Sequence, residues 1–240
     1  MMKKYLLLFS LTILSFNAYG QGKKIDKPVY TYKKGDYFGI GKWYLGREIA
    51  YVMGYEGISW LERPNREDEE KTSILIKNMK IKENDFIADI GAGSGYHVFK
   101  MAPVAKKGKV CAVDIQPEML RAILMNAEFD KNQNIELVQG AEKAVNLPKN
   151  KFDKILMVDV YHEFNYPKEM MESIIASLKE DGEIYLIEYR MEDPSVPIKK
   201  VHKMSEKQAV KEMKYVGLKL KENIDNLPWQ HCMVFIKDSN

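Results

Sequence analysis

The chain has 240 residues, of which 30% are charged and 45% are hydrophobic, and its formal net charge is +3. Acidic and basic residues are interspersed, which excludes the concentrated positive charge typical of a nucleic-acid-binding surface. A chain of this length can bury a sizeable core, and no repeat or linker divides it. We therefore expect one globular domain behind a separate N-terminal segment.

The first twenty residues have the pattern of a secretory signal. Lys3 and Lys4 precede an apolar stretch, residues 6–14, that is too short to span a bilayer, and residues 18–20 are Ala-Tyr-Gly. We predict a signal peptide over residues 1–20, export to the periplasm or cell envelope, and no stable membrane span after cleavage. The alternatives are an uncleaved membrane anchor, or a signal that does not function and leaves the protein in the cytoplasm.

Residues 21–65 are dense in aromatic residues and glycines. The aromatic residues are Tyr30, Tyr32, Tyr37, Phe38, Trp43, Tyr44, Tyr51, Tyr55 and Trp60. Aromatic rings supply apolar area and glycines permit hinge-like turns, so the segment is a candidate lid over a ligand site. Packing against the main sheet is the alternative. Asn65 can cap a helix that begins at Arg66, and we take residues 66–240 as the main domain.

The main domain opens with an apolar strand that runs directly into three glycines. Residues 86–96 read Phe-Ile-Ala-Asp-Ile-Gly-Ala-Gly-Ser-Gly-Tyr, which places Gly91, Gly93 and Gly95 in a tight turn after Asp89. A dinucleotide site usually reads G-x-G-x-x-G, whereas here the third glycine comes one residue early. The carboxylate beside the turn would repel a pyrophosphate and favours a cationic ligand, such as the sulfonium and ammonium of S-adenosyl-L-methionine (AdoMet). An ordinary tight turn is the alternative.

A second strand, residues 109–114, also ends in an acid. Asp114 lies 19 positions after Gly95, about where such folds place the residue that binds ribose hydroxyls. The alternative is that both acids simply end their strands and bind no ligand. Two acid-tipped strands in succession nevertheless favour a nucleotide-containing cofactor.

The rest of the chain continues to alternate strand and helix patterns. We expect further strands at residues 135–139, 154–159, 183–188, 218–223 and 231–236, and helices that begin at Pro117, at Pro167 and after Ser205. The alternation predicts an α/β fold with a mostly parallel sheet of six or seven strands. A short loop joins the last two strands, so the final strand is expected to be antiparallel.

Together these motifs resemble those of class I AdoMet-dependent methyltransferases, including a poorly characterised, exported subgroup, from about Arg66 to the C-terminus. The resemblance implies a Rossmann-like, doubly wound, seven-stranded sheet and AdoMet as cofactor. The cofactor-binding residues that it implies are Asp89, Gly91, Ala92, Gly93, Gly95, Asp114, Ile115, Gly140, Ala141, Glu142 and Asp159. Within this set, Ile115 would lie beside the adenine, and Glu142 stands where the family often has aspartate.

Chemistry is expected in residues 159–164, because strand ends at the carboxyl edge of a sheet face the ligand crevice. His162 would remove a proton from an acceptor hydroxyl, with Glu163 or Tyr161 orienting the imidazole or the substrate. Methyl transfer gains mainly from proximity and orientation, so a purely structural His162 is the alternative. The Asn/Asp-Pro-Pro-Tyr sequence of enzymes that methylate nucleic-acid amino groups is absent at this position, which disfavours a base or amide acceptor.

Three classes of function remain open. The favoured one is an AdoMet-dependent methyltransferase that acts at oxygen or carbon of a small-molecule or lipid-like acceptor, with no nucleic-acid partner. A non-catalytic AdoMet-binding protein is the second. The third is a nicotinamide-dependent oxidoreductase, which the glycine spacing and Asp89 disfavour.

The histidines and cysteines give no sign of a metal site or a disulfide. No metal-ligand spacing appears in the sequence, so no metal is predicted. The strand order of the resembling family would place Cys111 and Cys232 on strands too far apart for a bond, and we expect both thiols to be buried and free. The sequence leaves the oligomeric state open.

Overall fold

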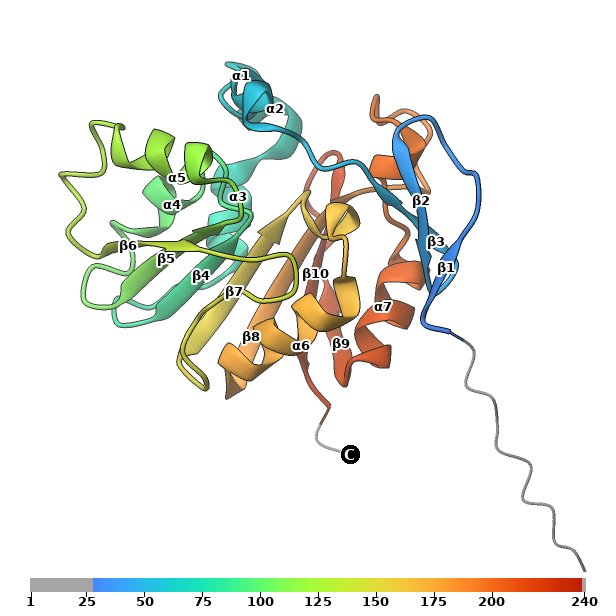
Figure 1. Cartoon of the computed structure of the whole chain (residues 1–240). Helices are drawn as coiled ribbons and strands as arrows, with labels where there is room; N and C mark the ends of the chain where they lie inside the picture. Colours follow the sequence, from blue (N-terminus) through green and yellow to red (C-terminus); the bar gives the residue numbers. More distant parts are fainter. Residues whose placement is uncertain (1–27, 239–240) are drawn as a thin grey trace, which may run out of the picture.

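The computed structural model describes residues 28–238, and a seven-stranded sheet forms the centre of this part of the chain (Figure 1). Its strands are β4 (Phe86–Ile90), β5 (Lys109–Asp114), β6 (Ile135–Gln139), β7 (Phe152–Val158), β8 (Leu178–Tyr189), β9 (Leu218–Asn223) and β10 (Gln230–Lys237). Their order is β6-β5-β4-β7-β8-β10-β9. Strands β4 to β8 pair in parallel, and β10 is antiparallel to both of its neighbours. The predicted sheet with an antiparallel last strand is confirmed.

Helices cover both faces of this sheet. They are α2 (Arg66–Glu70), α3 (Thr72–Asn78), α4 (Val98–Met101), α5 (Pro117–Leu124), α6 (Pro167–Ser177) and α7 (Glu206–Tyr215). Successive strand residues point to opposite faces. On β4, Ala88 and Ile90 therefore pack in the cluster that includes α6 and α7, whereas Ile87 packs with α3, α4 and α5. This is the doubly wound arrangement predicted.

The predicted helix starts are confirmed at Arg66, at Pro117, at Pro167 and after Ser205. Pro117 and Pro167 occupy the first turns of α5 and α6, and the Ser205 hydroxyl caps α7 by accepting from the Gln208 N–H. The helix expected from Arg66 is broken into α2 and α3, because Lys71 adopts a left-handed conformation with φ of 50°. Asn65 makes no side-chain cap there.

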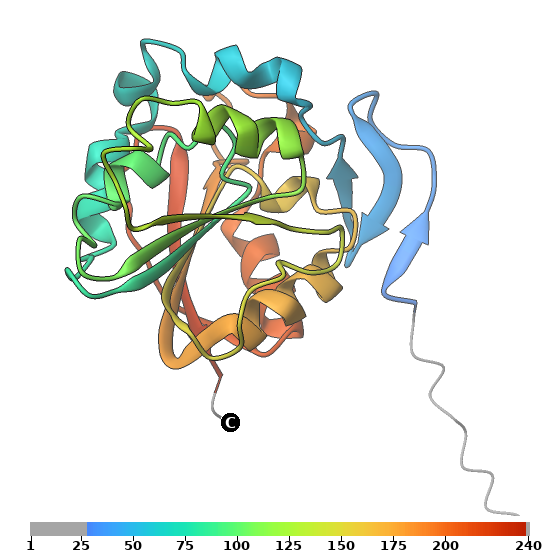
Figure 2. The ribbon, with the colours of Figure 1, turned by 60° about the vertical axis from the view of Figure 1, so that its left-hand side comes forward.

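Residues 28–50 form a small second sheet that the sequence did not predict. Strands β1 (Tyr30–Tyr32), β2 (Gly39–Tyr44) and β3 (Arg47–Ala50) pair antiparallel. Figures 1 and 2 place this sheet beside α6 and α7. The Arg47 guanidinium donates to Glu212 of α7 over 2.8 and 2.9 Å, and Tyr161 donates its hydroxyl to the same carboxylate over 2.8 Å. These contacts join the small sheet to the main domain.

A connecting segment leads from β3 back to α2 and contains η1 (Tyr55–Gly57) and α1 (Ile58–Leu61). In Figures 1 and 2 it runs across the top of the main sheet. We call residues 51–61 the cover segment.

Both cysteines are buried and free, as predicted. Cys111 lies on β5 and Cys232 on β10, with β4, β7 and β8 between them, and their side chains pack in clusters on opposite faces of the sheet. None of the helices in residues 28–238 has the length and apolar character needed to cross a bilayer. The predicted signal peptide, residues 1–20, lies outside the described residues.

Candidate functional site

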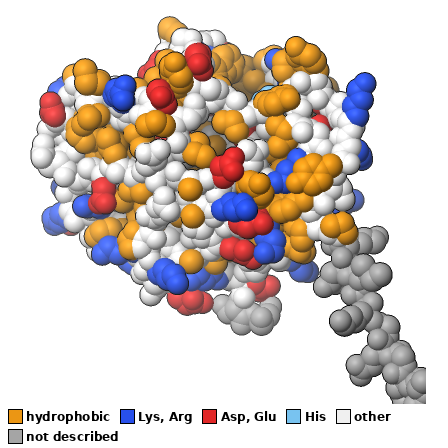
Figure 3. Space-filling model, viewed as in Figure 1, with side chains coloured by type: hydrophobic (Ala, Val, Ile, Leu, Met, Phe, Trp, Pro, Cys, Tyr) orange, Lys and Arg blue, Asp and Glu red, His pale blue; other side chains and the backbone are white. Residues whose placement is uncertain are grey.

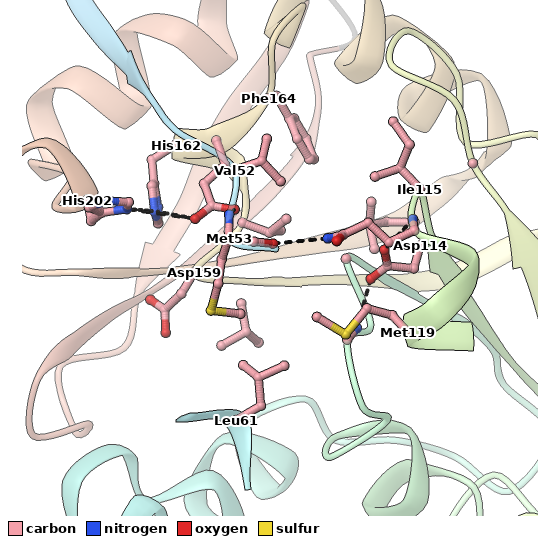
Figure 4. A pocket seen from close by; sticks show the side chains of 18 of the residues that line it. Val52, Met53, Leu61, Asp114, Ile115, Met119, Asp159, His162, Phe164 and His202 are labelled. Atoms are coloured by element: carbon pink, nitrogen blue, oxygen red, sulfur yellow. Dashed lines mark hydrogen bonds and ion pairs between the residues drawn. The ribbon is translucent and has the colours of Figure 1, made fainter. Parts of the chain in front are cut away.

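A cavity of about 480 Å³ lies between the cover segment and the carboxyl ends of the central strands. Val52, Met53 and Leu61 line it from the cover segment, while Asp114 and Asp159 line it from the sheet. Figure 4 shows Asp114 and Ile115 on one side of the cavity, His162 and His202 on the other, and Met53 between them. We call these two sides the Asp114 end and the His162 end.

The glycine turn after β4 forms the floor of the Asp114 end. Gly91, Gly93 and Gly95 have φ of 71°, 54° and 87°, a region that side-chain-bearing residues rarely adopt. A Cβ on Gly91 would lie 2.4 Å from a methyl carbon of Val160. Gly91 and Gly93 line the cavity, whereas a Cβ on Gly95 would meet Phe99, so that glycine serves helix packing. Ala92 is buried, and its N–H, like that of Gly91, donates to the Val113 carbonyl.

Asp114 holds this turn from the end of β5. One carboxylate oxygen accepts the Gly93 N–H over 2.9 Å, and the other accepts the Gln116 N–H over 2.9 Å. Burial raises the pKa of Asp114, and the backbone N–H groups oppose that rise. Ile115 is 42% exposed and lines the cavity beside the acid, where it offers an apolar surface to a flat ligand.

The loop after β6 closes the same end. Gly140, Ala141 and Glu142 all line the cavity, and the Gly140 N–H donates to the Asp114 carbonyl over 2.9 Å. The Glu142 carboxylate accepts a hydrogen bond from the Asn165 amide over 3.1 Å. The structure therefore places all three predicted residues of this loop at the cavity.

Asp89, on β4, and Asp159, just after β7, each have one unused oxygen atom within the described part of the chain. Oδ2 of Asp89 and Oδ1 of Asp159 are buried and have no hydrogen-bond partner in residues 28–238. Burial raises the pKa of Asp89 to about 7, with the Arg66 cation opposing the rise and Asp114 adding to it. Burial also raises the pKa of Asp159 well above its usual value, as do the charges of Glu70 and Glu188. Such acids are suited to a cationic ligand.

These acids differ in their access to the cavity. Asp159 lines it, in a left-handed conformation with φ of 51°, and its other oxygen accepts from the Gln230 amide over 2.6 Å. Asp89 is 2% exposed and does not line the cavity, so the structure does not place this predicted cofactor-binding carboxylate against a ligand there. Arg66 also lines the cavity and donates to Glu70 over 2.9 Å. The cavity thus offers both a carboxylate and a guanidinium.

The His162 end contains a cluster of titratable side chains from η2 (Tyr161–Glu163) and η3 (Lys200–His202). Nδ1 of His162 lies 2.6 Å from Oε2 of the fully buried Glu188, and Nε2 of His162 lies 3.1 Å from Nδ1 of His202. Burial lowers the pKa of His162, but the Glu188 charge and hydrogen bond outweigh it, so the pKa of His162 is raised. Burial and the neighbouring His162 lower the pKa of His202 to about 4.

Of the three residues predicted as catalytic, His162 and Glu163 line the cavity. Tyr161 is fully buried, and its hydroxyl donates to Glu212, so the structure places its ring in the core instead of against a ligand. Sequence reasoning did not find Glu188 or His202. His202 is 40 positions from His162, and no local spacing joins the two.

The cover segment is held to both ends of the cavity. The Met53 N–H donates to Oε2 of Glu163 over 3.1 Å. The Gln116 amide donates to the Met53 carbonyl over 3.0 Å and accepts the Tyr55 N–H over 2.9 Å. Because these bonds use the backbone of the segment, they position it over the cavity.

Comparison with known proteins gives one family match: the model of a family described as "Methyltransferase domain" matches residues 81–233. The uncharacterized methyltransferase YcgJ of Bacillus subtilis is 26% identical over 126 residues, which are 52% of this chain and 49% of that protein. The protein named "Probable ribosomal RNA small subunit methyltransferase A" of Methanosphaera stadtmanae is 34% identical over 89 residues, 37% of this chain and 31% of that protein. The chain therefore spans about half, or less, of these relatives.

A solved structure extends this likeness to the fold. A SAM-dependent methyltransferase from Aquifex aeolicus superposes with a TM-score of 0.72 at 21% identity, over 77% of this chain and 98% of that one. At this identity the likeness concerns the fold alone.

Proposed function

The chain belongs to the methyltransferase domain family, and we propose that the protein transfers the methyl group of AdoMet to an oxygen or carbon atom of a small-molecule or lipid-like acceptor. The observation that carries this proposal is a single covered cavity with two unlike ends. The Asp114 end combines the glycine turn with acidic side chains and an apolar surface, and these features suit a nucleoside. The His162 end has the polar groups for an acceptor.

The residues present fit AdoMet. Asp114 and Ile115 would hold its adenosine, as the resemblance implies, beside the turn at Gly91 and Gly93. The unpartnered oxygen of Asp159 suits an ammonium group, and Arg66 suits a carboxylate, so the amino-acid part of the cofactor would find opposite charges nearby. When bound, AdoMet supplies a methyl group already activated by a sulfonium.

The lining of the His162 end favours a small or apolar acceptor. Val52, Met53, Val160, Phe164 and Ile198 line the cavity along with His162 and Glu163. A cavity of 480 Å³ is in the lower half of the range of about 300–1,000 Å³ for ligand sites. Since one cavity must hold both cofactor and acceptor group, only a compact group fits beside the cofactor.

The chain's own contribution to catalysis is mainly alignment. Val160 and the cover segment exclude water, and His162 and Glu163 present the polar atoms that would bind an acceptor hydroxyl. Tyr161 is better described as a positioning residue, because it orients η2 through Glu212.

Nucleic acid and protein are the competing acceptor classes, because relatives are named as a ribosomal RNA methyltransferase and a protein-L-isoaspartate O-methyltransferase. Two features support the smaller acceptor. The cover segment lies over the cavity, and charges of both signs are interspersed on the face in Figure 3, whereas nucleic-acid surfaces gather positive charge.

For localisation we propose export, on the pattern of Lys3, Lys4 and the apolar residues 6–14. Fractionation of cells that produce the full chain tests this. Recovery of the uncleaved protein entirely from the cytoplasm would overturn it.

The proposed reaction is tested first by calorimetric titration of the full chain with AdoMet, its demethylated product and NAD. Replacing Asp114 by Asn should weaken AdoMet binding about 10–100-fold, because it removes a charged acceptor at the turn. Asp153→Asn is the matched control, since Asp153 also accepts a backbone N–H, that of Phe86 over 2.8 Å, but lies outside the cavity lining. NAD binding without AdoMet binding would overturn the assignment of the cofactor.

The acceptor class is then tested with methyl-labelled AdoMet. The protein is incubated in parallel with small hydroxylated compounds, a lipid extract, total tRNA and a protein extract, and labelled products are identified by mass. Label in the first two supports the proposal. Label confined to tRNA or protein would overturn the acceptor class and leave the methyltransferase assignment in place.

A further inference from the structure

Three ligand-type atoms converge at the His162 end of the cavity. They are Nε2 of His162, Nδ1 of His202 and Oε1 of Glu163, and they are separated by 3.1, 3.7 and 3.8 Å. Within residues 28–238 this is the one group of three histidine, cysteine or acidic side chains placed closely enough to hold a metal ion. We propose that it binds a zinc ion.

The spacing of the three atoms matches the size of zinc. A point equidistant from them lies about 2.1 Å from each, which is the usual distance from zinc to imidazole nitrogen and carboxylate oxygen. Two histidines and one glutamate also form a known set for zinc sites that keep a position open for substrate. Hard cations such as magnesium prefer oxygen ligands and fit this donor set poorly.

The surroundings engage the other polar atoms of two ligands, so that the three atoms face one another. Glu188 lies 2.6 Å from Nδ1 of His162, and Nε2 is therefore the ring nitrogen that faces His202. The other oxygen of Glu163 accepts the Met53 N–H. A carboxylate behind a ligating histidine is a common support of zinc sites.

The backbone of η2 is also held in place. The Arg47 guanidinium donates to the His162 carbonyl over 3.1 Å, and the His162 N–H donates to Oε1 of Glu188 over 3.2 Å. Both supports are buried, so the ligands are positioned before any metal arrives. Such preorganisation favours tight binding.

Two carboxylates lie at this cluster. Glu188 is fully buried and the Glu163 side chain is 11% exposed, and neither forms an ion pair with a lysine or arginine among the described residues. A zinc ion bound by the three side chains would place a positive charge close to both carboxylates. Buried charges are costly unless they are paired or coordinate a metal.

The proposed zinc site would bind and orient the methyl acceptor. His162, Glu163 and His202 all line the cavity, so a fourth coordination position would open into it. That position suits an oxygen donor on the acceptor, such as a hydroxyl, and would orient it at the end of the cavity opposite Asp114. This role rests on the proposed function, whereas the metal site itself does not.

The test is zinc titration of the full chain, purified without a histidine tag, stripped with a chelator and free of AdoMet. We expect one zinc ion per chain with submicromolar affinity and no comparable binding of magnesium. His202→Ala should lower zinc affinity about 100-fold or more, because it removes one of three ligands. His202 is partly exposed, and His202→Gln serves as a second variant should the alanine protein fail to fold.

His231→Gln is the matched control. His231 also contacts a glutamate, with Nε2 3.0 Å from Glu192, but it belongs to no three-ligand cluster in the described part of the chain. It should therefore keep wild-type zinc affinity. Cobalt substitution of the wild type should also give the visible absorption of a low-coordinate nitrogen and oxygen site.

Absence of zinc binding in the wild type, magnesium binding of equal strength, or full zinc affinity in both His202 variants would overturn the metal site. The AdoMet titration is separate from this one. Zinc binding without AdoMet binding would contradict the proposed function and support the metal site. AdoMet binding without zinc binding would contradict the metal site alone.

Discussion

The two ends of the cavity are built in different ways. At the Asp114 end, consecutive backbone groups shape the site, since Gly91 and Gly93 make the turn and Asp114 accepts a backbone N–H from it. At the His162 end, side chains from η2, η3 and β8 meet across long stretches of sequence. The first end depends on glycines, which residues with a side chain cannot replace without strain. The second end depends on contacts between elements that lie far apart in the sequence.

The two ends are therefore sensitive to different kinds of substitution. A Cβ in the glycine turn changes the backbone itself, whereas a change at the His162 end removes one contact and leaves the strand ends in place. We expect AdoMet affinity to fall most with a change at Gly91, less with one at Asp89 and least with one at Gln116.

Gly91→Ala should have the largest effect. Alanine at φ of 71° costs about 1–2 kcal/mol, and the Cβ clash with Val160 adds about 1–3 kcal/mol. We expect AdoMet affinity to fall 100-fold or more by calorimetry, about 2.7 kcal/mol. Gly217→Ala is the control, because Gly217 has φ of 85° but no atom within 4 Å of its added Cβ. Equal loss of AdoMet binding in both variants would contradict a role of the turn in ligand binding.

Asp89→Asn tests the charge behind the turn. Burial raises the pKa of Asp89 to about 7, so the folded protein holds this proton more tightly than the unfolded chain, in which the pKa is about 3.9. The stability due to that proton is present below about pH 4 and is lost as the pH rises to about 7. Asparagine stays neutral. The variant should therefore gain about 3–4 kcal/mol of unfolding free energy over wild type at pH 8 relative to pH 4.

Urea denaturation of the wild type and the variant at pH 4 and pH 8 measures this change. If the two proteins differ in unfolding free energy by the same amount at both pH values, the raised pKa of Asp89 is ruled out. AdoMet binding should respond in the opposite sense. Removal of the charge should weaken affinity about tenfold at pH 8, because the cationic cofactor loses a nearby carboxylate.

Gln116→Ala should have the smallest effect and addresses the link between the two ends. It removes both hydrogen bonds to the cover segment, at Met53 and Tyr55, and should weaken AdoMet binding about threefold while speeding amide exchange at Tyr55. Gln133→Ala, which loses a bond to the Asp130 carbonyl away from the cavity, should change neither. Unchanged exchange at Tyr55 would show that Gln116 does not hold the cover segment.

The same contrast explains what could be predicted from sequence. Strands at residues 109–114, 135–139 and 218–223 were predicted with their observed limits, because apolar runs end there at clear polar or glycine signals. The Asp114 end was found because its residues stand in short motifs. The start of the helix at Arg66 was predicted, but its break was not, since nothing at Lys71 marks a left-handed residue.

The less predictable parts depend on long-range contacts. Strands β1 to β3 are short, and their pairing carries no local signal. His162 and Glu163 follow a strand end and were found. Glu188 lies within a buried strand and His202 stands alone in a loop region, so neither has a local pattern that would indicate a site.

The contact between Arg47 and Glu212 bears on how the protein divides into autonomous folding units. The family match begins at residue 81, yet the cation for the buried Glu212 carboxylate comes from β3, outside that match. A chain shortened to start at residue 66 would lose this cation, and removal of one partner of a buried ion pair typically costs about 3–5 kcal/mol. We therefore expect the smallest piece that folds alone to be longer than the segment that the family model matches and to include residues 28–50.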